Sequence, residues 1–121
     1  MTPAIKWRAA PEEANYPAAQ SYLSLVYDPR TTAQLVKRLR TAPLTSYKSK
    51  DIFRASGLPL LGVSSSQMAR DQKKIRKGRK LSPILLVRDQ GHGKVVIADG
   101  YHRLCAVYTF DEDAEIPCKI V

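Results

Sequence analysis

Apolar residues recur at helical spacing in the first third of the chain, and this pattern predicts two helices. The first starts near Pro17, and its apolar face comprises Ala19, Tyr22, Leu23 and Val26. Asp28 and Pro29 then provide an N-cap and a favoured first-turn residue for the second helix. Pro43 stops that helix, whose apolar face comprises Thr32, Leu35, Val36 and Leu39. The pattern therefore predicts a helical hairpin over residues 16–42 with one shared apolar side.

The segments on either side of this hairpin are less regular. Residues 1–15 are rich in Pro and Ala without a clear period, so we expect a loose N-terminal arm. Trp7 either anchors this arm on the domain or presents it to a partner. After the hairpin, the sequence predicts a short helix over residues 51–56 that Gly57 ends, followed by an extended stretch over residues 58–63.

A further helix is predicted from Ser64, which forms a capping box with Gln67. We expect it to run to Lys77 and to end at Gly78. Its apolar face is thin, because it comprises only Met68, Ala69 and Ile75. Most of this helix should therefore face solvent or a ligand.

The hydrophobic period then changes to one typical of strands. The apolar run at residues 82–88 is continuous, as in a strand covered on both faces. The pattern predicts a hairpin over residues 83–98, a helix over residues 100–110 and a last strand over residues 115–121. We therefore expect an α+β fold with leading helices and a small mixed sheet in the C-terminal half.

The composition fits a single domain over residues 16–121. The chain has 121 residues, and 44% of them are hydrophobic, so it can bury one core without disulfides. Cys105 and Cys118 lie in apolar segments without metal-ligand spacing, which indicates buried thiols in a reducing compartment. His92 in a turn is no metal site by itself. The sequence lacks a signal-peptide pattern and a membrane-spanning run, so we expect a soluble cytoplasmic protein.

Lysine and arginine outnumber the acidic residues by 20 to 11, which gives a formal net charge of +9. Such an excess is typical of proteins that bind polyanions, although it can also serve solubility alone. Seven basic residues and one acid lie within residues 70–80. The residues expected to track a DNA or RNA backbone are Arg70, Lys73, Lys77, Arg79 and Lys80. The alternative is a solvated helix face, and the lack of aromatic neighbours argues against stacking on single strands.

The segment Asp99-Gly100-Tyr101-His102-Arg103 stands where a predicted strand gives way to a predicted helix. The first N–H groups of a helix have no intrahelical partner and favour an anion. Arg103 and His102 would add donors to a bound phosphate. Gly100 would let a ligand approach the backbone closely. We therefore expect a phosphate site at this junction.

The same residues allow a purely structural interpretation. Asp99 can be an N-cap that occupies the N–H groups a phosphate would need, and Gly100 can serve only the turn. A metal ion held by Asp99 and bound to the phosphates would reconcile the two interpretations. His102 and Arg103 lie outside the packing face expected for this helix, which comprises Tyr101, Leu104, Cys105 and Tyr108.

The run DGYHRLCA, followed by EIPCKIV, resembles the ParB N-terminal and sulfiredoxin-like superfamily. Members carry a Gly-x-His-Arg or Gly-x-Arg-Arg turn at a strand–helix junction, and the Ile-Pro-x-Lys ending is similar to that of sulfiredoxins. The resemblance covers about residues 57–121. It implies a nucleotide ligand, ATP or CTP with Mg²⁺, whose phosphates lie between this turn and the preceding helix. Aligned on Ile75, that helix has at its ligand positions Gln67, Arg70 and Lys74.

The chain departs from the family where catalysis would need it. The sulfiredoxin nucleophile position is Tyr101, and a phenol cannot replace a thiolate at neutral pH, so sulfinic acid reductase activity is not expected. Kinase members use a Glu as base, and this chain has none between Glu13 and Glu112. The remaining candidate bases are Asp51, Asp71 and Asp99, and none is assigned. The added domains of ParB partition proteins do not fit in 121 residues.

These observations predict a nucleotide- or phosphate-binding module that regulates a partner or associates with nucleic acid. One alternative is a phosphoryl-transfer or phosphate-hydrolysing enzyme, such as a nucleotidase, kinase or nuclease. Another is a fold that has lost its ligand. The residues expected to bind the ligand are Arg70, Lys74, Asp99, Gly100, Tyr101, His102 and Arg103.

Overall fold

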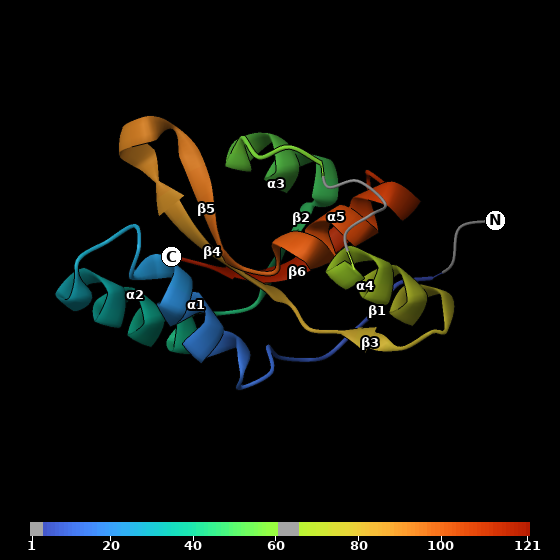
Figure 1. Ribbon diagram of the computed structural model, residues 1–121, viewed down its shortest axis with the longest axis horizontal. Helices are drawn as coiled ribbons and strands as arrows, with labels where there is room; N and C mark the ends of the chain where they lie inside the picture. The colour runs from blue at the N-terminus through green and yellow to red at the C-terminus, as the bar shows by residue number, and fades with distance from the viewer. Residues whose placement is uncertain (1–3, 61–65) are drawn as a thin grey trace.

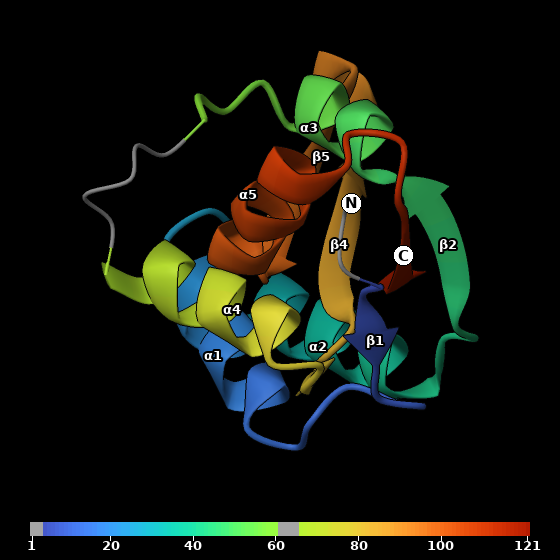
Figure 2. The same cartoon turned by 90° about the vertical axis from the view of Figure 1, so that its right-hand side faces the viewer.

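The computed structural model describes residues 4–60 and 66–121. These residues have the α+β fold expected from the sequence, with five α-helices and six strands in two sheets. The larger sheet lies between two layers of helices, which cover its central strands on both faces (Figures 1 and 2). No helix within the described ranges combines the length and the apolarity needed to cross a bilayer.

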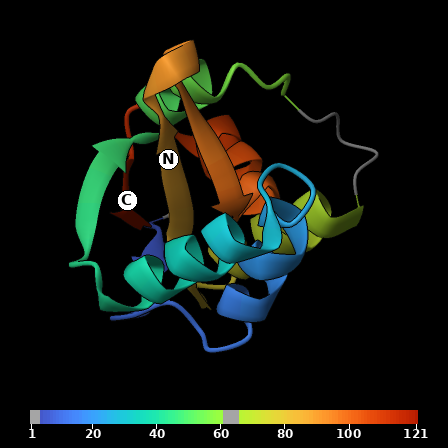
Figure 3. The ribbon, with the colours of Figure 1, turned by 90° about the vertical axis from the view of Figure 1, so that its left-hand side faces the viewer.

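The first layer is the predicted hairpin of α1 (Asn15–Leu23) and α2 (Pro29–Thr41), which lies across one face of the sheet (Figure 3). Asp28 caps α2, because its carboxylate accepts hydrogen bonds from the Thr31 backbone N–H at 2.8 Å and the Thr31 hydroxyl at 2.9 Å. The apolar face predicted for α2 is confirmed, since its buried residues are Thr32, Leu35, Val36 and Leu39. The face of α1 differs from the prediction and comprises Tyr16, Ala19 and Leu23.

The larger sheet contains, in spatial order, β2 (Thr45–Lys48), β6 (Glu115–Ile120), β4 (Ile84–Asp89) and β5 (Lys94–Asp99). β4 and β5 form the predicted antiparallel hairpin, and the predicted last strand, β6, runs parallel to β4. The sequence did not predict β2, which pairs antiparallel with β6 at the edge. All of its residues are exposed, so it lacks the alternation that marks a half-buried strand.

Alternation along β4 divides the interior into two cores. Leu85 packs with α1 and α2, whereas Leu86 packs on the opposite side of the sheet. β5 follows this alternation until its end, where Ile97 is opposite Leu86 and Asp99 is opposite Leu85. Ala98 is therefore one extra residue on β5, which makes a β-bulge that bends the strand just before the chain enters the next helix.

The second layer comprises α3 (Ser49–Ser56), α4 (Ser66–Arg76) and α5 (Tyr101–Phe110). The predicted short helix is confirmed as α3, and Gly57 ends it in the left-handed region with φ of 66°. The predicted capping residue Ser64 and residues 61–63 of the predicted extended stretch lie outside the described residues. α5 starts where the sequence predicts, and its buried residues are Leu104, Cys105, Ala106 and Val107.

The buried face of α4 contains an acid. Met68 and Ile75 are 1% exposed, as expected, whereas Ala69 faces solvent. Asp71 is 2% exposed, because its position three residues after Met68 and four before Ile75 keeps it on their side of the helix. α4 therefore presents one carboxylate to the interior while its basic residues face outward.

The N-terminal segment is tied to the domain and is not the loose arm that the sequence suggested. β1 (Lys6–Trp7) pairs in parallel with β3 (Lys80–Leu81), which follows α4 (Figure 1). The backbone N–H of Glu12 donates to the Ser82 hydroxyl at 3.0 Å. Trp7 packs against the larger core cluster, so it anchors the segment. Residues 1–3 lie outside the described part.

Candidate functional site

The predicted phosphate site lies where β5 ends and α5 begins. Gly100 is the N-cap residue, with φ of 113° and ψ of 14°, and no side chain caps the helix. A Cβ at Gly100 would lie 2.4 Å from Cγ2 of Ile84. The turn and the packing therefore require glycine here, which favours the structural alternative for this residue. The uncapped N–H groups remain as donors at the start of α5.

Asp99 does not cap α5, so the alternative in which Asp99 is the N-cap of this helix is wrong. Its Oδ2 accepts a hydrogen bond from Nη2 of Arg103 at 2.8 Å, and the side chains of the two residues are only 17% and 16% exposed. The same Nη2 also donates to the Pro83 carbonyl at 3.4 Å. Nε of Arg103 is buried and has no hydrogen-bond partner among the residues described. The guanidinium is thus held in place by Asp99 with a donor still unused.

Asp71 contributes a second carboxylate from α4. Its Oδ2 is buried and has no hydrogen-bond partner within residues 4–60 and 66–121. Burial raises the pKa of Asp71, against the lowering effect of Arg103, Lys74, a hydrogen bond from Gln67, and His102. A buried polar atom without a partner is rare in proteins and is typical of a place that binds a proton, an ion or a ligand.

These groups line two hollows that adjoin each other. The polar hollow has a volume of about 400 Å³ and is lined by Gln67, Asp71, Asp99, Gly100, His102 and Arg103. The second has a volume of about 430 Å³ and shares three of these residues, Asp99, Gly100 and His102. Its other walls are mainly apolar and aromatic, namely Ala18, Tyr22, Leu58, Ile97, Ala98 and Tyr101. The start of α5 therefore stands between a charged and an apolar compartment.

Tyr101 and His102 differ in their surroundings. The Tyr101 hydroxyl donates a hydrogen bond to the Pro59 carbonyl, and burial raises the pKa of the phenol. Tyr101 is therefore a wall residue held in its protonated form. His102 is exposed and lines both hollows, so its imidazole is available to a ligand in either one.

The predicted ligand residues on α4 are only partly brought to this site. Arg70 and Lys74 are exposed and are not among the described residues that line either hollow. Gln67, the third position of the alignment, does line the polar hollow, together with Asp71. Lys74 still acts on Asp71 through its charge. Of the three candidate bases, Asp71 and Asp99 come together, whereas Asp51 lies on α3 in a different hollow.

The residues expected to contact nucleic acid are all exposed. Arg70, Lys73 and Lys77 lie on α4 or just beyond it, and Arg79 and Lys80 continue into β3. None of the five forms an ion pair with another described residue. Their charge is therefore not neutralised within this part of the chain.

The sequence analysis named Asp71 only as a candidate base and did not predict its burial, although a signal was present. An acid at the spacing of Met68 and Ile75 lies on the only apolar face of an otherwise basic helix. The residues of the apolar hollow come from α1, from the segment after α3 and from β5. Only the three-dimensional arrangement brings these distant segments together.

The described residues hold no group of three or more His, Cys, Asp or Glu side chains that could bind a metal ion unaided. Searches with protein-family models, among curated proteins and among solved structures find no match to this chain. The resemblance to the ParB N-terminal and sulfiredoxin-like superfamily therefore stays a hypothesis, and the function has to be argued from the site.

Proposed function

We propose that this chain is a cytoplasmic binding module for a nucleotide or another phosphate ligand, with a regulatory or nucleic-acid-associated role. The observation that carries the proposal is the meeting of a polar and an apolar hollow at Gly100 and His102. A nucleotide matches the two hollows, because its charged phosphates suit the polar hollow and its flat base suits the apolar one. The sequence resemblance of this segment to the ParB and sulfiredoxin-like superfamily points to the same class of ligand.

The phosphate end of the ligand belongs in the polar hollow. The uncapped N–H groups of α5 and its dipole favour an anion there. Nε of Arg103 is an unused charged donor, and His102 adds a donor from the exposed side. Asp99 holds the guanidinium in place, so less side-chain entropy is lost when an anion binds.

The two carboxylates of this hollow would repel a phosphate if nothing balanced them. Mg²⁺ commonly uses one or two carboxylates together with phosphate oxygens. The unpartnered Oδ2 of Asp71 is a suitable oxygen for such an ion, with Asp99 as the second carboxylate. Bound Mg²⁺ would neutralise phosphate charge. We therefore expect nucleotide binding to be stronger with Mg²⁺ than without it.

The base belongs in the apolar hollow, against Tyr22, Leu58 and Tyr101. Stacking of a base on an aromatic ring contributes about 1–3 kcal/mol in single-strand-binding proteins. Tyr22 is 44% exposed, so its removal should not disturb the fold. Tyr22→Ala should weaken the binding of a nucleotide and leave the binding of inorganic triphosphate unchanged.

A thermal-shift titration with ATP, CTP and inorganic triphosphate, each with and without Mg²⁺, tests the proposal, because binding to the folded state raises the melting temperature. His102→Ala should reduce the shift, and His92→Ala is the matched control at the other exposed histidine. Arg103→Ala should weaken binding about tenfold to over a hundredfold, since it removes charged donors. The proposal fails if neither nucleotide shifts the melting temperature, or if His92→Ala has the same effect as His102→Ala.

Catalysis at phosphates is the second candidate function, and Asp71 is the observation that favours it. A buried carboxylate with a raised pKa in the ligand hollow is suited to proton transfer. As a general base, Asp71 would take a proton from a water molecule that attacks the terminal phosphorus, while the bond to the bridging oxygen breaks. Asp71→Asn should then lose phosphate release in a colorimetric assay and keep the part of nucleotide binding that does not depend on Mg²⁺. If the parent protein releases no phosphate, catalysis is excluded and the binding module remains as the proposed function.

Association with nucleic acid is supported by the exposed basic surface of α4 and β3. Contacts through Lys and Arg alone would read phosphates and not bases. The affinity for duplex DNA should then fall with salt, with a logarithmic slope of about 0.9 per phosphate neutralised.

Charge reversal of Lys73, Lys77 and Lys80 to Glu should flatten the salt slope. A matched control reverses three exposed basic residues elsewhere, namely Arg30, Lys37 and Lys94. An equal loss of binding in the two triple variants would mean that net charge alone, and not this surface, attracts the DNA.

A further inference from the structure

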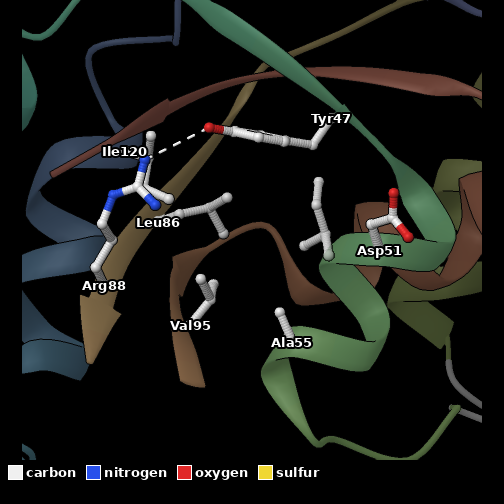
Figure 4. A pocket seen from close by; sticks show the side chains of 8 residues that line it. Tyr47, Asp51, Ala55, Leu86, Arg88, Val95 and Ile120 are labelled. Carbon is white, nitrogen blue, oxygen red and sulfur yellow. Dashed lines mark hydrogen bonds between the residues drawn. The ribbon is translucent and has the colours of Figure 1, made fainter. Parts of the chain in front are cut away.

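A separate hollow lies between α3 and the sheet, away from the start of α5. Leu86, Val95 and Ile120 form its floor, and α3 closes one side with Ile52 and Ala55 (Figure 4). Its volume is about 210 Å³. Val95 and Asp99 are four residues apart on β5, which at about 3.3 Å per residue separates this hollow from the phosphate site by about 13 Å. The two sites can therefore be tested independently.

The hollow is left open because α3, the helix that packs beside it, is short and because β2 lies at the edge of the sheet. α3 has eight residues and contacts both β5 and β2. Every residue of β2 is exposed, so nothing in the described chain covers the sheet between β2 and α3 at this end. Two side chains of the floor, Val95 and Ile120, are partly exposed and can contact a small molecule from outside, whereas Leu86 is buried beneath them.

Two hydrogen-bond donors converge at one end of this apolar floor. The Arg88 guanidinium from β4 and the Tyr47 hydroxyl from β2 point toward each other and are 3.5 Å apart (Figure 4). A contact of that length is a weak hydrogen bond, so both groups retain donors for a ligand. Arg88 forms no ion pair with any residue in the described ranges. The charge of Arg88 is therefore uncompensated beside an apolar surface.

Asp51 stands at the opposite end, on α3 (Figure 4). It too takes part in no ion pair with another described side chain. The hollow thus has a cationic end, an apolar middle and an anionic end. A ligand that fits this order carries a negative group near Arg88 and no second negative group near Asp51.

We propose that this hollow is a second binding site, specific for a small organic monocarboxylate with an apolar or aromatic body. The carboxylate accepts hydrogen bonds from Arg88 and from the Tyr47 hydroxyl, and charge-assisted bonds of this kind are among the strongest in proteins. The body packs on Val95 and Ile120, the partly exposed residues of the floor. Small-molecule sites commonly combine an apolar lining with a few polar groups, and the volume here is below the roughly 300–1,000 Å³ typical of drug-sized ligands.

The size of the hollow sets the expected affinity. A ligand of about ten non-hydrogen atoms is expected to bind with a dissociation constant in roughly the millimolar range. Nuclear magnetic resonance is suited to such affinities, because backbone amide shifts report both the site and its occupancy. Phenylacetate is the probe, since it has one carboxylate and one aromatic ring.

The experiment titrates the ¹⁵N-labelled full chain with phenylacetate, with benzyl alcohol and with 4-carboxyphenylacetate. Phenylacetate should shift the amides of Ala55, Leu86 and Val95 in a saturable way. Benzyl alcohol lacks the charge and should bind about tenfold more weakly or worse. 4-Carboxyphenylacetate should also bind more weakly, because its second carboxylate meets Asp51. Equal binding of all three compounds, or saturable shifts confined to other residues, would overturn the proposal.

Two variants identify the polar end, and a third serves as a control. Arg88→Gln should reduce the affinity for phenylacetate about tenfold or more, and Tyr47→Phe should reduce it to a smaller extent. Arg30→Gln removes one exposed positive charge at a distant place on α2 and should have no effect. Unchanged affinity in Arg88→Gln, with the amide spectrum of a folded protein, would contradict the site. Equal losses of affinity in Arg88→Gln and Arg30→Gln would mean that phenylacetate is attracted by the positive charge of the protein in general and not by this site.

Discussion

Alanine substitution at two glycines can separate the cost of a backbone conformation from the cost of packing. Gly93 ends the turn between β4 and β5 with φ of 63° and ψ of 36°, and a Cβ there would meet nothing within 4 Å. Gly100 has φ of 113°, and a Cβ there would lie 2.4 Å from Cγ2 and 2.7 Å from Cβ of Ile84. The two variants make the same chemical change at positive φ, so their difference reports the packing at the start of α5 together with any extra strain from the larger φ of Gly100.

The structure sets the expected magnitudes. Gly93→Ala should cost roughly 1–2 kcal/mol, the usual penalty for alanine in the left-handed region. Gly100→Ala adds about 1–3 kcal/mol of overpacking to a backbone strain of about 1–3 kcal/mol. Ile84 is 0% exposed, so any shift that makes room for the new Cβ has to be taken up inside the core. The expected total of about 2–6 kcal/mol is a large part of the roughly 5–15 kcal/mol that stabilises an ordinary domain.

Urea denaturation followed by circular dichroism measures both variants. Gly100→Ala should lower the midpoint well below that of Gly93→Ala, with the dependence on urea unchanged if both remain two-state. Equal losses of unfolding free energy would refute the reasoning. They would mean that the junction of β5 and α5 relaxes freely, and that the geometry of the phosphate site is not fixed by this contact.

Three further predictions concern single side chains. Asp28→Ala should lower the melting temperature and Asp28→Asn should not, because only alanine removes the cap on Thr31. Burial raises the folded pKa of Asp71 above 3.8. The unfolding free energy should therefore increase as the pH falls through the folded pKa of Asp71 toward 3.8, and Asp71→Asn should abolish this component in urea titrations at several pH values. Burial raises the pKa of Cys118 to about 11, so its alkylation at pH 8 should occur only at the rate of unfolding, and fast labelling of the folded protein would contradict this.

The parts of the fold that the sequence predicted are those whose local signals agree with their final surroundings. α2 has a capping acid, a first-turn proline and a complete apolar face, and all three are used as expected. The hairpin of β4 and β5 follows from apolar runs on both sides of a glycine turn. β2 was missed because its residues are exposed on both faces. A strand of this kind is stabilised by its pairing with β6, which no local pattern reveals.

The sequence predicted where the candidate site lies, but it did not predict the contacts between the side chains of the site. The grouping of Asp99 with Arg103 could be anticipated from the strand–helix junction. Their direct hydrogen bond could not, because it depends on the unusual backbone of Gly100. On α4 the alignment with the sulfiredoxin-like proteins favoured Gln67, Arg70 and Lys74, of which only Gln67 lines the polar hollow, whereas the phase of the helix turns Asp71 inward. Helical phase was the better guide, because burial is decided by the face on which a side chain lies.

The pairing of β1 with β3 has a consequence for the order of folding. The hydrogen bond between Glu12 and Ser82 spans 70 positions along the chain. During synthesis β1 therefore leaves the ribosome long before any partner exists for it. Closing so long a loop costs entropy before the contact is gained. β3 is also the segment that joins α4 to the central sheet, and α4 contacts α5, so α4 can pack on α5 before β1 is fixed. We expect hydrogen exchange to be fastest at Lys6 and Trp7 among the strand residues, and the attachment of β1 to be the last step of folding.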